Sequence, residues 1–203
     1  MPHQLGHLNY APKTVGENID KWHVDTLRYD YVMFVTDPTR QKGGEFQYFK
    51  GTKSEAETAR NKGIPLPAEK IVSPKMPGAG YAIMQQGNMV VHRGAKLNEP
   101  YDRVTMVNAY VPLDTELDDP SRFSDLKTVD PHQLLFPEWA RHKAWLSRGK
   151  LNRLIEKLPF TDDKDLIINE LKGAIRDVET AIKDLNDSSE GEQNYYGDLE
   201  KEK

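Results

Sequence analysis

The hydrophobic pattern of the sequence changes its period near Pro131, and this change constrains the fold more than any other feature. Before it, short runs of alternating apolar and polar residues are separated by turn residues, a pattern typical of β-strands. After it, apolar residues recur with a period near 3.6, which predicts amphipathic helices. We therefore expect a mainly β unit followed by C-terminal helices.

Seven runs before residue 115 have the pattern of strands. They are GHLNYAP, KWHVD, DYVMFVTD, EFQYFKG, GYAIMQQ, NMVVHRG and RVTMVNAYVP. So many short strands indicate a sandwich or a jelly-roll barrel, here spanning residues 1–115. Residues 51–79 interrupt the strands, because Ser54 and Glu57 have capping-box spacing and a proline-rich stretch follows. We expect this segment to form a lid-like excursion over one end of the sheet.

The remainder of the chain is expected to contain a connector at residues 116–131 and helices at residues 132–186. The second helix, from about Thr161 or Asp162, carries one apolar stripe: Ile167, Leu171, Ala174, Ile175, Val178, Ile182 and Leu185. The stripe needs a surface to cover, so the helices are expected to pack on the β unit or to form a homodimer with a second copy. Residues 187–203 are acidic and lack periodicity, which predicts a disordered tail with Tyr195 and Tyr196 in solvent.

The composition excludes several functions. The 203 residues include no cysteine, so any metal must be held by His, Asp or Glu. A net charge of -4 without a dense Lys/Arg stripe argues against nucleic-acid binding. No apolar run approaches the roughly 18 residues of a membrane span, and the N-terminus has no hydrophobic signal segment. We expect a cytoplasmic protein that does not associate with membranes.

A candidate metal site begins with His23 and Asp25, which stand two positions apart in a strand-like run and therefore share one face. Two imidazoles and one carboxylate on one face form the triad that binds Fe(II) while leaving positions open for oxygen and a co-substrate. Of the six histidines, His92 lies in another strand-like run, NMVVHRG, which comes from a distant part of the chain. Each residue alone has a simpler interpretation, since a strand histidine is more often a hydrogen-bonded core residue.

A candidate anion site follows at Arg103 and Thr105, which share a strand face eleven residues after His92. Arginine can hold a carboxylate through two charge-assisted hydrogen bonds, and a hydroxyl can add a third. The alternative is a salt bridge from Arg103 to Asp102 or Glu99. An exposed pair of this kind contributes only about 0–1 kcal/mol, so it explains little about an arginine within an apolar strand.

Other residues near these candidates are weaker. Asn9 and Tyr10 lie on the first strand, where they either contact the pocket or pack at its rim. Arg93 follows the distal histidine and points to the opposite face, which predicts a surface position.

The combination of His23-x-Asp25, a distal His92 and Arg103-x-Thr105 resembles the Fe(II)/2-oxoglutarate-dependent dioxygenases. The resemblance covers roughly residues 5–113 and implies a double-stranded β-helix of the jelly-roll or cupin type. By position, it implies that His23, Asp25 and His92 ligate iron and that Arg103, with Thr105 and Tyr10, binds the co-substrate 2-oxoglutarate. The implied activity is oxidation of a substrate by O2 with release of succinate and CO2.

Three functions remain open at this point. The first is an oxygenase that hydroxylates, desaturates or cyclises a small molecule, such as an amino acid derivative or a secondary metabolite. The second is a protein-residue hydroxylase of the same fold, and the third is a non-catalytic cupin-type binding module. Members of the family commonly have elements before the first core strand, whereas here that strand begins almost at Met1. Either the C-terminal helices take over their packing role, or the chain is a fragment or a compact member.

Overall fold

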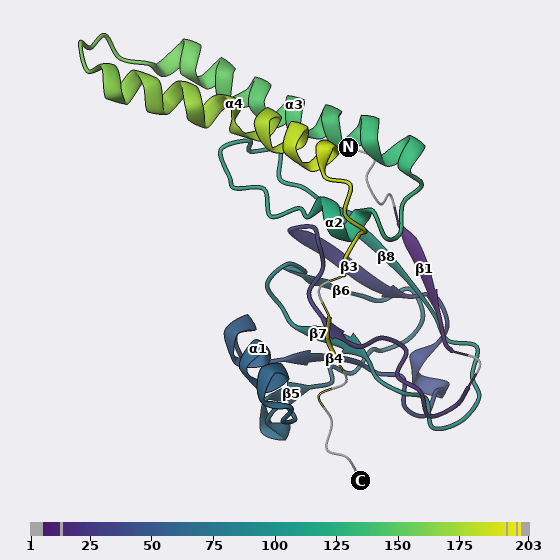
Figure 1. Cartoon of the computed structure of the whole chain (residues 1–203). Coiled ribbons are helices and arrows are strands. Elements are labelled where there is room, and N and C mark those ends of the chain that lie inside the picture. Colours follow the sequence, from purple (N-terminus) through teal and green to yellow (C-terminus); the bar gives the residue numbers. More distant parts are fainter. Residues whose placement is uncertain (1–5, 13, 194, 198, 200–203) are drawn as a thin grey trace. The chain divides into compact units, whose positions relative to one another are not determined.

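The computed structural model describes residues 6–12, 14–193, 195–197 and 199 (Figure 1). The described chain forms two compact units. The first contains the residues up to Tyr110 together with those from Tyr195 onward, and the second contains residues 111–193. None of the helices in these described ranges is long and apolar enough to cross a membrane.

The first unit consists of two antiparallel sheets. The four-stranded sheet has the order β1 (His7–Tyr10), β8 (Val104–Tyr110), β3 (Tyr29–Phe34), β6 (Ala82–Gln85). The five-stranded sheet has the order β5 (Ile71–Val72), β4 (Phe46–Phe49), β7 (His92–Gly94), β2 (Trp22–His23), β9 (Tyr195–Gly197). All seven predicted strands are present, and the prediction of a β unit followed by helices is confirmed.

The two sheets share a hydrophobic core. Strand alternation places Val32 and Phe34 on the buried face of β3. Phe46, from β4 of the other sheet, packs against them. Together with Val107 they form one buried cluster. Strands β3 and β8 of one sheet and β4 of the other are therefore fixed against each other by this core.

The segment at residues 51–79 contains a helix, α1 (Lys53–Lys62), and the strand β5. Thr52 caps the helix in a reciprocal pair of hydrogen bonds with Glu55, two residues earlier than the predicted pair Ser54 and Glu57.

This segment packs into the first unit through buried apolar residues. Ala56, Ala59 and Leu66 are buried in one cluster with Trp22 and Phe49. None of the residues 51–79, all of which are described, lines the pocket that contains the candidate site. Burial of its apolar residues therefore ties the segment to the core, and the expectation of a lid-like excursion finds no support in the described residues.

The predicted tail also contributes to the first unit. Tyr195–Gly197 form β9, which pairs with β2 so that Tyr195 lies opposite His23. Tyr196 is only 5% exposed and packs with Trp22 and Val24. The prediction of a disordered tail with solvated tyrosines is wrong for these residues. Residues 194, 198 and 200–203 of that tail lie outside the described residues.

Replacing Tyr196 by alanine is expected to lower the free energy of unfolding by about 2 kcal/mol, because a large buried side chain is removed from the core. Thermal or urea unfolding measures this change. The matched control is Tyr81→Ala, since Tyr81 is exposed. Equal stability of the two variants would show that β9 does not contribute to the core.

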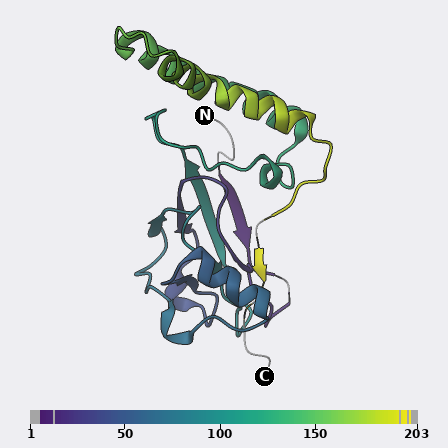
Figure 2. The same cartoon turned by 60° about the vertical axis from the view of Figure 1, so that its left-hand side comes forward.

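The second unit consists of α2 (Phe123–Leu126), α3 (His132–Lys157) and α4 (Lys164–Asn186). Helices α3 and α4 pack side by side, as both views show (Figures 1 and 2). Their shared buried cluster consists of Phe123, Leu126, Leu135, Trp139 and Ala181.

A buried polar cluster ties the segment before α2 to α3. Asp119 lies 2.7 Å from His142 Nε2 and 2.8 Å from Lys143 Nζ. Burial by itself would raise the pKa of Asp119, but the hydrogen bond from His142 and the charge of Lys143 outweigh it and hold this pKa well below its usual range. The carboxylate form of Asp119 therefore stabilises the second unit at neutral pH.

Candidate metal centre

Two imidazoles meet because β2 and β7 are neighbouring antiparallel strands. His23 and His92 are directly opposite each other in the register, and their ring centroids are 4.3 Å apart. The sequence analysis expected a second imidazole from a distant strand, and the strand pairing brings it into place.

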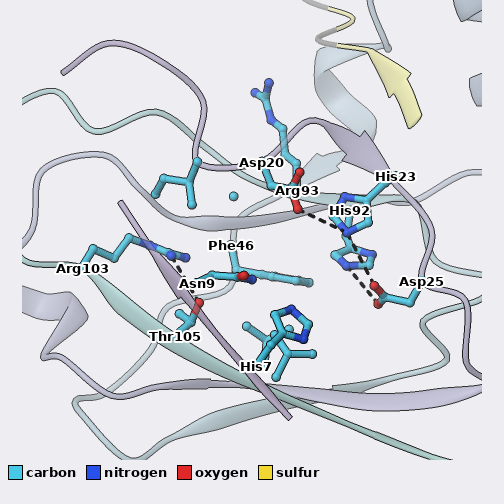
Figure 3. Close-up of a pocket in the computed structure, with 14 residues that line it drawn as sticks. His7, Asn9, Asp20, His23, Asp25, Phe46, His92, Arg93, Arg103 and Thr105 are labelled. Carbon is cyan, nitrogen blue, oxygen red and sulfur yellow. Dashed lines mark hydrogen bonds and ion pairs between the residues drawn. The ribbon is translucent and has the colours of Figure 1, made fainter. Parts of the chain in front are cut away.

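Asp25 completes the group two residues beyond His23 (Figure 3). Its Oδ1 lies 3.6 Å from His23 Nε2, and its Oδ2 lies 3.2 Å from His92 Nε2. One donor atom from each of the three residues lies within 4.8 Å of the others, so the group could hold a metal ion. The backbone N–H of Asp25 donates to the Gly87 carbonyl at 2.9 Å, which fixes the loop that carries the carboxylate.

Both imidazoles are oriented by the backbone. Nδ1 of His23 lies 2.7 Å from the Lys21 carbonyl oxygen, and Nδ1 of His92 lies 2.9 Å from the Val90 carbonyl oxygen. A carbonyl can only accept, so Nδ1 carries the proton in each neutral ring. In the neutral ring Nε2 then carries the lone pair, which is the tautomer that metal-binding histidines use, whereas in the charged ring Nε2 can donate to Asp25.

The charges around the group favour a cation. Burial by itself would lower the pKa of His23, but the hydrogen bond with Asp25 and the negative charges of Asp20 and Asp25 outweigh it and raise this pKa to about 9. Burial would raise the pKa of Asp25, but the charge of His92 and the hydrogen bonds from both imidazoles hold it well below its usual range. A divalent cation at these atoms would replace the proton on His23.

Two further polar side chains support the group, and the sequence analysis missed both. Gln85 Nε2 donates to Asp30 Oδ1 at 2.9 Å and to Asp25 Oδ2 at 3.3 Å. Asp30 is fully buried, and its pKa is raised to about 8, first by burial and then by the charge of Asp25. Burial and the nearby carboxylate of Asp25 therefore favour the protonated form of Asp30. Its position on the buried face of β3, between apolar residues, was the signal in the sequence.

Gly87 allows these carboxyl groups to lie close to the backbone. A Cβ atom built at Gly87 would lie 1.7 Å from Asp30 Oδ2 and 2.6 Å from Asp25 Oδ2. Any side chain at this position would displace one or both carboxyl groups.

Gly87→Ala is therefore expected to weaken binding of divalent metal roughly tenfold, as loss of the partners that orient a ligand does elsewhere. Isothermal titration with Fe(II) under nitrogen measures this change. Gly78→Ala is the control, since no atom lies within 4 Å of a Cβ placed there. If both variants bind metal like the parent protein, Asp25 is not a ligand.

The pocket that contains the group is also lined by Arg103 and Thr105 (Figure 3). Arg103 is 3% exposed; its Nε donates to the Gly44 carbonyl at 2.7 Å and its Nη1 to Thr105 Oγ1 at 3.4 Å. Its guanidinium lies over the ring of Phe34, 5.3 Å from the centroid. Burial lowers the pKa of Arg103 to about 10, against the opposing charge of Glu45, so the group stays positive at neutral pH.

The alternative of a structural salt bridge for Arg103 finds no support in the described part of the chain. Glu99 pairs with Lys42 at 2.6 Å, and no ion pair within 4.0 Å joins Arg103 to a described carboxylate. A buried cation that lines a pocket and has no ion pair within 4.0 Å in the described part of the chain is suited to an anionic ligand.

The structure differs from the sequence analysis at two further candidates. Tyr10 is 64% exposed and does not line the pocket, whereas Asn9 does, because neighbouring strand residues point to opposite faces. Arg93 is buried and not at the surface. Its guanidinium lies 4.7 Å from the centroid of the Trp22 ring, and its Nε donates to Gln47 at 2.9 Å.

Comparison of the sequence with models of known protein families finds no match, and no curated protein matches it. Functional inference therefore depends on the geometry of the His23, Asp25 and His92 group and of its pocket.

Proposed function

We propose that the protein is an Fe(II)- and 2-oxoglutarate-dependent oxygenase that oxidises a small molecule by hydroxylation, desaturation or cyclisation. The observation that carries this proposal is the convergence of His23, Asp25 and His92 in one pocket with the buried cation of Arg103. The two antiparallel sheets around this pocket are compatible with a double-stranded β-helix, which is the finer fold that we propose.

The donor set fits Fe(II). The two Nε2 atoms and one carboxylate provide three ligands on one side once the metal has replaced the proton on His23, and a chain without thiolates offers no softer alternative. Fe(II), when bound, would supply open positions for O2 and for the oxo-acid end of 2-oxoglutarate, whose oxidation yields succinate and CO2.

The residues of this chain would perform the remaining tasks. Arg103 would bind the distal carboxylate of 2-oxoglutarate, and the Thr105 hydroxyl would add a hydrogen bond. Gln85 would hold the Asp25 carboxylate in place through its side-chain amide. His7, Asn9 and Asp20 line the same pocket and provide polar contacts for a small, polar substrate.

The test is a two-stage assay on the full chain. Under nitrogen, the Fe(II)-loaded protein is titrated with 2-oxoglutarate, and binding is expected only when the metal is present. Oxygen is then admitted with a panel of amino acids and other metabolites, and succinate release is measured. An Fe(II)-loaded protein that does not bind 2-oxoglutarate would refute the proposed co-substrate, and a protein that binds no divalent metal would refute the proposed site.

A further inference from the structure

Helix α4 has two different apolar faces. One contains Ala174 and Ala181, which are buried. The other is between 37% and 57% exposed and consists of Ile168, Leu171, Ile175, Val178, Ile182 and Leu185. A continuous exposed apolar face on a helix is a signature of association with another surface.

The spacing of this exposed face is that of a coiled coil. Its residues, which we call the α4 stripe, are separated alternately by three and four positions along the whole helix. This is the a/d pattern of a heptad repeat, with isoleucine at each a position and leucine or valine at each d position. Such a stripe packs best against a second helix with the same repeat.

The α4 stripe is complementary to itself when two copies run antiparallel. About a twofold axis at the middle of the helix, Ile175 lies opposite Val178 of the second copy. In the same register, Leu171 lies opposite Ile182, and Ile168 lies opposite Leu185. Each a residue therefore meets a d residue throughout, as a closed twofold interface requires.

The charges beside the stripe favour the same arrangement. Lys172 and Glu179 occupy e positions of the repeat, and neighbouring e positions pair with each other in an antiparallel coil. Lys172 of each copy then lies near Glu179 of the other, on both sides of the axis. A parallel coil would instead place e positions next to the g positions Ile167, Ala174 and Ala181, which carry no charge.

We propose that the protein is a homodimer whose interface is the α4 stripe, with the two copies of α4 antiparallel. The two α3–α4 pairs then form a four-helix arrangement around the stripe. This proposal concerns residues 111–193 alone and does not depend on the proposed function.

Sedimentation velocity and light scattering on the full chain test the proposal. The parent protein is expected to be dimeric at micromolar concentration. Ile175→Glu is expected to raise the dimer dissociation constant by at least about 100-fold, because it places two carboxylates in the centre of an apolar interface. Leu113→Glu is the matched control, since Leu113 is 89% exposed and lies outside the stripe. It is expected to remain dimeric.

Charge reversal tests the antiparallel orientation and avoids changing the apolar residues. Lys172→Glu alone and Glu179→Lys alone are each expected to weaken the dimer several-fold, and the double reversal is expected to restore it. Helical content by circular dichroism confirms that each variant is folded.

A monomeric parent protein would overturn the proposal, and so would an Ile175→Glu dimer of unchanged affinity. A parent monomer in which Ile175→Glu lowers the melting temperature would indicate that the stripe is covered within one chain.

Discussion

Replacing His92 by alanine is expected to abolish binding of Fe(II) at micromolar concentration. His92 supplies one of three donor atoms, and its Nε2 is directed at Asp25 by the hydrogen bond between Nδ1 and the Val90 carbonyl. Loss of an outer partner already weakens metal binding about 10- to 100-fold, so loss of a ligand should raise the dissociation constant more than about 100-fold. Anaerobic titration calorimetry and metal analysis after desalting measure the effect.

The matched control for this experiment is His7→Ala. His7 also lines the pocket but does not belong to the group of three possible ligands. It is expected to retain metal at close to the parental affinity. Because His92 is buried against Phe46, unfolding of His92→Ala must be followed in parallel. Asp25→Asn provides a second test, since it keeps the volume of the side chain and removes its charge. A folded His92→Ala protein that binds Fe(II) with parental affinity would contradict the assignment.

The central residues of the candidate site could be predicted from short local patterns, although Asp25 lies on the loop after β2 and not on the strand face that alternation implied. His23 and Asp25 needed only their spacing of two, and His92 was identified as a histidine in a distant strand-like run. The pairing of His23 with His92 across β2 and β7 depends on the register of two strands far apart in sequence. A pattern within one strand cannot give that register.

The residues that support the site could not be predicted for the same reason. Asp30 and Gln85 meet because they are opposite each other in the pairing of β3 with β6. Gly87 is restricted by the carboxyl groups of Asp25 and Asp30, and this contact has no trace in the local sequence. Asp30 could have been singled out as an acidic residue on a buried strand face, but its partner could not.

The errors at residues 51–79 and at the C-terminus also have a physical cause. The strands β5 and β9 contain two and three residues, which is too short for an alternating pattern to be recognised. They form because β4 and β2 offer backbone partners and because the core around Trp22 buries Tyr196. Tertiary packing determines whether such short segments form strands, whereas their composition alone predicts a loop or a disordered tail.

The second large effect is expected at Arg103, which tests the co-substrate separately from the metal. If Arg103 binds the distal carboxylate of 2-oxoglutarate, each charge-assisted hydrogen bond contributes roughly 1.5–3 kcal/mol. Lysine keeps the charge but cannot form two parallel hydrogen bonds. Arg103→Lys is therefore expected to weaken 2-oxoglutarate binding by roughly 10- to 100-fold, because 1.4 kcal/mol corresponds to a factor of about ten. Arg103→Ala is expected to weaken it further.

Three measurements distinguish this role from a structural one. Fe(II) affinity should change little in both variants, because Arg103 is not a metal ligand. Thr105→Val should weaken 2-oxoglutarate binding only by a factor of about five, since one neutral hydrogen bond of about 1 kcal/mol is lost. Arg93→Lys is the control, because Arg93 lines the same pocket while its guanidinium is held by Trp22 and Gln47.

If Arg103 instead stabilises only the fold around Gly44 and Phe34, Arg103→Ala will lower the melting temperature and leave the 2-oxoglutarate affinity of the folded protein unchanged. That outcome would leave a metal site with a different co-substrate, because the His23, Asp25 and His92 group does not depend on the arginine.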